Sequence, residues 1–90
     1  EKTETTKTTE APILKAETGA EELKKEEQRL IMEIAKNPKN GELYEILGDL
    51  YVKMNTFSDA KESFEAAIEL NPYNELLQKK RSQVLEKMII

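Results

Sequence analysis

Eight residues between positions 41 and 74 constrain the fold more than any other feature of this chain. They combine large and small side chains at fixed intervals: Tyr44, Leu47, Gly48, Tyr51, Ala60, Phe64, Ala67 and Pro72. Inside a helix, glycine costs about 1 kcal/mol relative to alanine. We therefore expect a packing reason for Gly48, namely two helices that cross closely where side chains are minimal. Ala60 and Ala67 are the small residues expected on the opposing helix.

This set of residues resembles the tetratricopeptide repeat (TPR), whose pattern is W-x2-L-G-x2-Y, then A-x3-F, then P. Tyr44 stands where the family prefers tryptophan, and every other position carries the preferred residue. The resemblance implies an all-α fold in which residues 41–74 form one complete helix-turn-helix repeat. It also implies a scaffold for binding other proteins, without catalytic activity.

The flanking segments resemble parts of neighbouring repeats. A shift of 34 residues lays Leu30 on Phe64, so the segment before position 38 resembles the second helix of a preceding repeat. Glu26 and Glu33 replace the two small alanines there, as expected if this segment has no first helix to cross, or if excision or divergence removed that helix. Residues 75–90 have the register of a next first helix and resemble the polar capping helix of a solenoid. We expect an antiparallel solenoid fragment of four helices: a half-repeat, the full repeat and the cap.

The spacing of apolar residues independently predicts four helices separated by short loops. We expect them to run from Thr18 to Asn37, from Gly41 to Met54, from Thr56 to Asn71 and from Asn74 to Ile90. Thr18-x-x-Glu21 and Thr56-x-x-Asp59 read as capping boxes, and Asn74 reads as an N-cap. The faces expected to be buried carry Leu23, Leu30, Ile31 and Ile34; Leu43, Leu47, Leu50, Tyr51 and Met54; Phe57, Ala60, Phe64, Ala67 and Ile68; and Leu77, Val84, Leu85 and Met88.

Residues 1–17 differ in composition from the rest of the chain. They are rich in Thr, Glu and Lys, and their only apolar cluster is the short stretch 11–14. Such a segment buries too little apolar surface to offset the entropy of ordering it. We expect a disordered tail or tether over 1–17 and a helical domain over 18–90. Nothing in the sequence fixes the compartment: the cytoplasm is the default, and an extracytoplasmic or membrane-tethered location through the tail remains open.

Composition excludes several kinds of chemistry. The chain has no cysteine and no histidine, so thiolate and imidazole metal sites and histidine-dependent catalysis are impossible. Ser58-x-x-Lys61 matches a serine-nucleophile motif but has no companion motif. A net charge of −4 without a basic stripe argues against nucleic acid, and no apolar run approaches the length of a membrane span. We expect no enzyme activity, no cofactor, no metal and no direct membrane insertion.

In the TPR family, the first helix of each repeat lines a concave groove that holds a peptide or helix of a partner. This resemblance makes the outward face of the helix 41–54 the candidate site, continued by the last helix. The expected binding residues are Glu42, Glu45, Ile46, Asp49, Val52, Lys53, Lys79, Lys80, Gln83 and Lys87. Three acids beside two β-branched side chains suit a partner with basic and apolar residues. The lysines near the C-terminus would make the other end of the groove basic, so a partner with both signs also fits.

Three alternatives stay open at this point. In structural self-assembly into a homo-oligomer, the acidic helix 41–54 of one copy would meet the basic last helix of another, and Met88, Ile89 and Ile90 would add apolar contact. A membrane-tethered adaptor would use the tail as its anchor point. An inert spacer would bind nothing. Concentration-dependent sedimentation separates self-assembly from a monomeric receptor.

Overall fold

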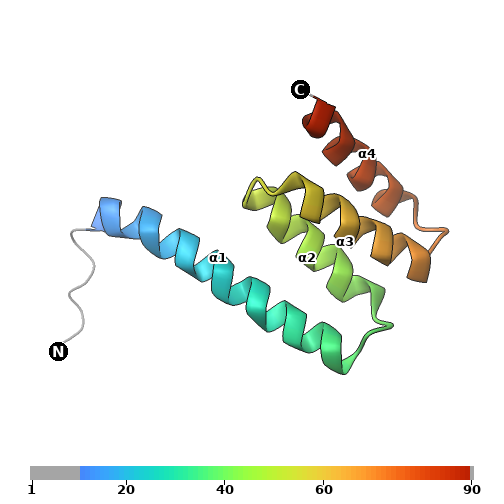
Figure 1. Ribbon diagram of the computed structural model, residues 1–90, viewed down its shortest axis with the longest axis horizontal. Helices are drawn as coiled ribbons and strands as arrows, with labels where there is room; N and C mark the ends of the chain where they lie inside the picture. Colours follow the sequence, from blue (N-terminus) through green and yellow to red (C-terminus); the bar gives the residue numbers. More distant parts are fainter. Residues whose placement is uncertain (1–10, 90) are drawn as a thin grey trace.

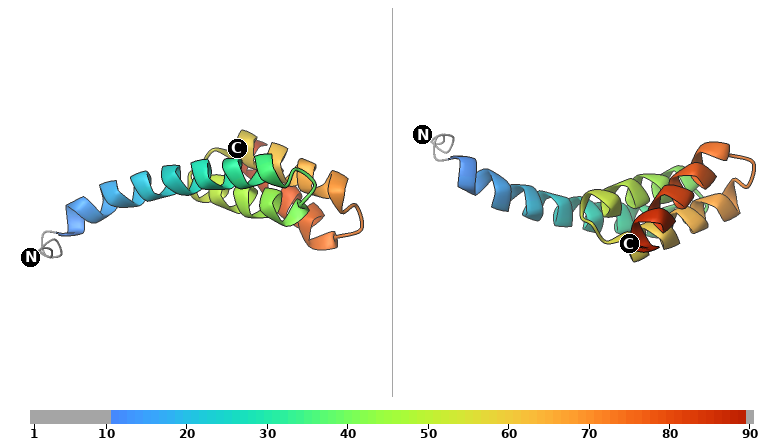
Figure 2. Two further views of the ribbon diagram at one scale, coloured as in Figure 1. Left: turned by 90° about the horizontal axis from the view of Figure 1, so that it is seen from below. Right: turned by 90° about the horizontal axis from the view of Figure 1, so that it is seen from above.

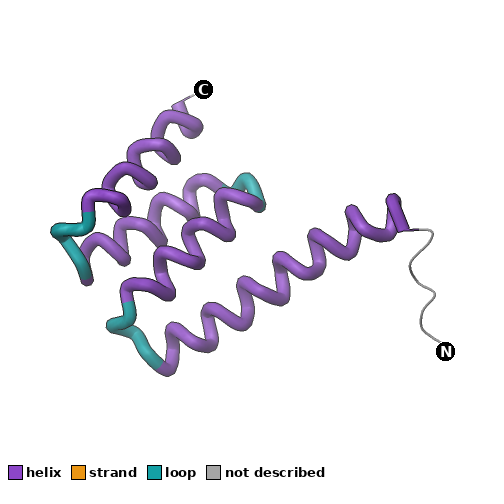
Figure 3. The backbone as a smooth tube through the Cα atoms, turned by 180° about the vertical axis from the view of Figure 1, so that it is seen from behind, coloured by secondary structure: helices purple, strands orange, loops and turns teal. Residues whose placement is uncertain are grey.

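The computed structural model describes residues 11–89, and these residues form four α-helices and no strand. The helices are α1 (Ala11–Lys36), α2 (Gly41–Lys53), α3 (Phe57–Leu70) and α4 (Glu75–Ile89). Loops of three or four residues join them, so each helix runs antiparallel to the next (Figures 1 and 3). The expected all-α, four-helix arrangement is confirmed.

The closest helix crossing is centred on Gly48. A Cβ atom at this position would lie 2.5 Å from Cε1 and 2.7 Å from Cδ1 of Phe64. Real Cβ atoms do not approach other atoms so closely, so the Phe64 ring occupies the space that any side chain at Gly48 would need. Ala60 and Ala67 have no exposed surface on the opposing helix. The glycine is therefore explained by packing, and α2 packs most extensively against α3.

The core runs through all four helices. Phe64, Leu30 and Leu77 are its largest fully buried side chains, and Val84 brings α4 into it. Leu23 and Ile34 of α1 pack on its edge. Two residues expected to be buried are not: Ile31 is 47% exposed and Met88 is 43% exposed. Both predictions were wrong because each outer helix packs extensively against a single neighbour, α1 against α2 and α4 against α3. That neighbour covers a narrower stripe of the helix than the apolar periodicity suggests.

The first helix starts earlier than predicted. It begins at Ala11 instead of Thr18, so residues 11–17 of the expected tail are helical, whereas residues 1–10 lie outside the described part of the chain. Pro12 at the second position suits a helix start, where its missing N–H is not needed. Thr18 and Gly19 then lie inside the helix. The predicted capping box at Thr18 therefore does not mark the start of α1. The N-terminal half of α1 extends past the other helices (Figure 2).

Asparagines cap two of the helices. The Asn74 side chain accepts hydrogen bonds from the N–H groups of Leu76 (3.0 Å) and Leu77 (3.4 Å), which confirms it as an N-cap. Asn40 does the same for α2 through Glu42 N–H at 3.1 Å. Thr56 occupies the N-cap position of α3 without a side-chain capping bond. Its hydroxyl instead donates to the Tyr51 carbonyl at 3.2 Å, so the second capping box does not form.

Two polar contacts tie the outer helices to the central pair. The Tyr51 hydroxyl donates to Glu27 at 2.7 Å and joins α2 to α1. Arg81 Nε donates to Glu65 at 3.0 Å and joins α4 to α3. The hydrogen bond from Arg81 lowers the pKa of the Glu65 carboxyl. The contact between Arg81 and Glu65 helps to hold α4 against α3, and the position of α4 in turn shapes the surface described next.

Candidate functional site

A groove runs between α2 and α4 and contains two open pockets. The first pocket, of about 450 Å³, has Phe64 of α3 and Val84 of α4 in its lining. Both side chains are almost fully buried, so only a small part of each forms the floor. Its remaining lining comes from Asp49, Val52, Lys53, Lys80, Gln83 and Lys87. The second pocket, of about 360 Å³, is lined by Gly41, Glu42, Glu45, Leu70, Asn71, Asn74 and Leu77.

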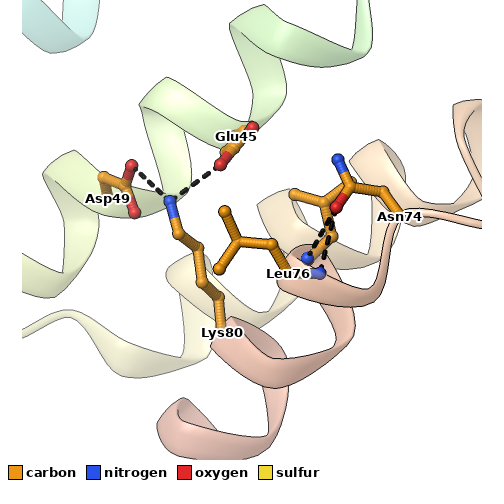
Figure 4. Close-up of polar contacts among 6 residues, drawn as sticks. Glu45, Asp49, Asn74, Leu76 and Lys80 are labelled. Atoms are coloured by element: carbon orange, nitrogen blue, oxygen red, sulfur yellow. Dashed lines mark hydrogen bonds and ion pairs between the residues drawn. The ribbon is translucent and has the colours of Figure 1, made fainter.

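Lys80 crosses the groove from α4 to α2. Its Nζ lies 2.8 Å from Glu45 Oε2 and 3.0 Å from Asp49 Oδ2 (Figure 4). Glu45 and Asp49 are one turn apart on α2, so one ammonium group reaches both carboxylates. Burial disfavours the charged Lys80, but the hydrogen bonds to Glu45 and Asp49 outweigh that penalty and raise its pKa. Lys80 therefore stays protonated and holds the two helices together across the groove.

The ion pairs of Lys80 with Glu45 and Asp49, called the Lys80 bridge below, lie between two pockets that carry opposite charges. One lysine between two carboxylates leaves a net charge of −1 at the centre of the groove. Lys53 and Lys87 line the first pocket, and Glu42 lines the second. Within the described residues none of these three makes an ion pair; Lys87 lies 5.9 Å from the centroid of the Phe57 ring. The groove thus has one basic end and one acidic end.

The structure gathers most of the residues expected at the binding face. Eight of them line the two pockets: Glu42, Glu45, Asp49, Val52, Lys53, Lys80, Gln83 and Lys87. Ile46 is 41% exposed and Lys79 is exposed, but neither lines a pocket. The residues assigned from sequence to an acidic and a basic surface thus meet inside one chain, where Lys80 pairs with two of the three acids.

Sequence reasoning missed the contributions of α3 and of the turn that follows it. Phe64 was assigned to the core alone, and Leu70, Asn71 and Leu77 were not expected near a binding surface. Leu70 and Asn71 end α3 beside the start of α2 because the helices are antiparallel. The repeat register could have shown this, because positions 70 and 71 end the second helix of the repeat whose first helix begins at position 41.

The described residues offer no sign of other site chemistry. Among residues 19–89, whose side chains the structure describes, no cluster of acidic side chains is arranged to hold a metal ion. No helix in this stretch has both the length and the apolar character needed to cross a membrane.

Comparison with known families agrees with the helical pattern. Residues 41–74 match the family model of the tetratricopeptide repeat, which confirms the resemblance seen in the sequence. The match covers α2, α3 and the turn that follows α3. No curated protein and no solved structure matches the chain. The family whose model residues 41–74 match is a non-catalytic protein-interaction repeat, and the groove described above lies along the first helix of the matched segment.

Proposed function

We propose that this domain binds a peptide segment or helix of a partner protein in the groove between α2 and α4. The observation that carries the proposal is the first pocket, where Phe64, Val84 and Val52 lie beneath a rim of charged side chains. An apolar centre with a polar rim is the usual organisation of a protein-binding surface. The family match over 41–74 supports the same class of function.

The bridge made by Lys80 changes which partner chemistry fits. A partner with only basic side chains would have to compete with Lys80 for Glu45 and Asp49, both already within hydrogen-bonding distance of it. Glu42 is exposed and is the acid that remains for such a partner. The expected contribution of Glu45 and Asp49 to binding is therefore smaller than their charges alone suggest.

The same bridge weighs against self-assembly through opposite charges. The contact between acidic α2 and basic α4 that would join two copies is already formed within one chain. To form it between chains, Lys80 would first have to leave its two partners. The exposed Met88 and Ile89 at the end of α4 still favour self-association, as do the exposed Ile31 and Met32 of α1. A monomer by sedimentation at high protein concentration would exclude it.

The test is to select binders from random twelve-residue peptides displayed on phage and to map synthetic copies by NMR. We expect amide shifts at groove positions such as Val52 and Gln83, and none on the outer face of α1. The variant Val52→Glu places a charge beside the pocket floor and should abolish binding. The control is Met32→Glu, which should leave binding unchanged because Met32 lies on the exposed face of α1. If no peptide is enriched, or if the shifts fall elsewhere, the proposal is wrong.

A further inference from the structure

We propose that the groove selects an extended segment that carries opposite charges about five residues apart, with apolar residues between them. Its basic side chain would lie at Glu42 and its acidic side chain at Lys53. This inference rests on the proposed function, because it names the partner chemistry that the same groove would prefer. It goes beyond that function by fixing both the sign and the spacing of the charges.

The first step of the argument is the position of the two unpaired charges. Glu42 lines the second pocket, and Lys53 lines the first. Both side chains are exposed, and neither makes an ion pair within the part of the chain that the structure describes. Each charge is therefore available to a ligand, although Lys53 acts at a distance on the Glu26 carboxyl of α1, whose pKa is lowered by Arg29 and, to a smaller extent, by Lys53. Lys87, from α4, adds a second positive charge to the pocket that Lys53 lines.

The second step is their spacing along α2. Eleven residues separate Glu42 from Lys53, and at 100° per residue eleven residues return to within about 20° of the same direction. Both side chains thus leave the same face of the helix. A rise of 1.5 Å per residue places them roughly 16 Å apart. An extended chain advances about 3.3 Å per residue, so five residues cover this distance.

The third step is what lies between them. Glu45 and Asp49 occupy the intervening turns of α2, and both are bonded to Lys80. The bridge leaves one net negative charge in place of two, which reduces the attraction of the centre for a cation. Beside it, Val52 and the floor formed by Phe64 and Val84 offer apolar contact. The residues between the two charges of the bound segment are therefore expected to be apolar, above all those next to its acidic side chain, because the apolar floor belongs to the pocket that Lys53 lines.

The phage selection described above tests the charge pattern. Enriched sequences should carry Lys or Arg and Asp or Glu about five positions apart, flanking a Leu, Ile, Val or Phe. Enrichment of peptides with a single sign of charge, or with no preferred spacing, would overturn this inference, although the proposed function would stand if those peptides still map to the groove. Failure to enrich any peptide would overturn both.

Four variants, each replacing one charged side chain with glutamine, test which residues contact the peptide. The ligand is the tightest-binding enriched peptide, synthesised with blocked ends. Glu42→Gln and Lys53→Gln should each raise Kd about threefold at low salt, since exposed ion pairs are weak. The double variant should raise it about tenfold, because sites this far apart act independently. Glu86→Gln and Lys36→Gln make the same charge changes on exposed residues of α4 and α1 that line neither pocket, and Kd should not change. Equal losses in all four variants would overturn the assignment.

Discussion

Replacing Gly48 with alanine is the sharpest test of the helix crossing that shapes the groove. The new Cβ would lie 2.5, 2.7 and 2.8 Å from three atoms of the Phe64 ring. Ordinary carbon contacts are about 3.5–4 Å, so the ring or the helix has to move by close to 1 Å. Phe64 is 1% exposed and is surrounded by core side chains, which leaves the ring little room to move.

The magnitude follows from two opposing effects. Overpacking of a core by one or more methylene groups costs about 1–3 kcal/mol. Alanine regains about 1 kcal/mol of helix propensity relative to glycine. The net loss in unfolding free energy is then up to about 2 kcal/mol, which lowers Tm by roughly 4–8 °C per kcal/mol in a domain of this size. Gly48→Leu adds more volume at the same place and should cost more.

Thermal and urea unfolding followed by circular dichroism would measure this loss in a double-mutant cycle with Phe64→Leu. Without the aromatic ring, alanine at position 48 should no longer clash, so the coupling energy should be about 1–3 kcal/mol. Gly19→Ala is the matched control, because a Cβ at that helical glycine meets nothing within 4 Å. It should stabilise α1 or leave it unchanged. If Gly48→Ala also stabilises the domain, or shows no coupling to Phe64, the packing explanation is wrong.

Two further variants test how the outer helices are held. Leu77→Ala should cost about 2–5 kcal/mol, because Leu77 is 2% exposed and ties α4 to the core; a smaller loss in urea unfolding would mean that α4 packs loosely. Burial and the hydrogen bond to Glu27 raise the pKa of the Tyr51 hydroxyl. A group whose folded pKa is raised stabilises the fold below its unfolded pKa, near 10, and loses that contribution at higher pH. Above pH 10, the unfolding free energy of Tyr51→Phe should therefore fall less steeply with pH than that of the parent. Equal slopes in the two proteins would contradict this explanation.

The sequence predicted the central helix pair well because its packing is local and periodic. The close crossing of α2 and α3 requires small residues at Gly48 and Ala60 and a large one at Phe64. The residue types at these positions therefore predict the crossing. Asn74 could be recognised as an N-cap from its position alone. The helix crossing and the N-cap both depend on residues that lie close together in the sequence.

The start of α1 and the centre of the groove could not be predicted in the same way. Composition argued for a tail up to residue 17, but the helix continues back to Ala11, and Pro12 in its first turn is compatible with that start. The two ion pairs of Lys80 join residues 31 and 35 positions apart. Such a pair depends on where α4 packs relative to α2. The amphipathic pattern of a single helix does not predict the distance between side chains of two different helices.

Lys80 also decides whether the acids of α2 are available to a partner, and Lys80→Met tests this directly. Methionine keeps the length of the side chain but leaves Glu45 and Asp49 without a cation, so the centre of the groove changes from a net charge of −1 to −2. We expect a stability loss of roughly 1 kcal/mol, as for a partly exposed ion pair. A peptide with lysines at both ends should bind several-fold more tightly than to the parent, and the gain should shrink in 0.5 M salt. Lys36→Met makes the same change in net charge at an exposed position of α1 that lines neither pocket. An equal gain in both variants would show that net charge alone attracts the peptide, and that the bridge does not control the groove.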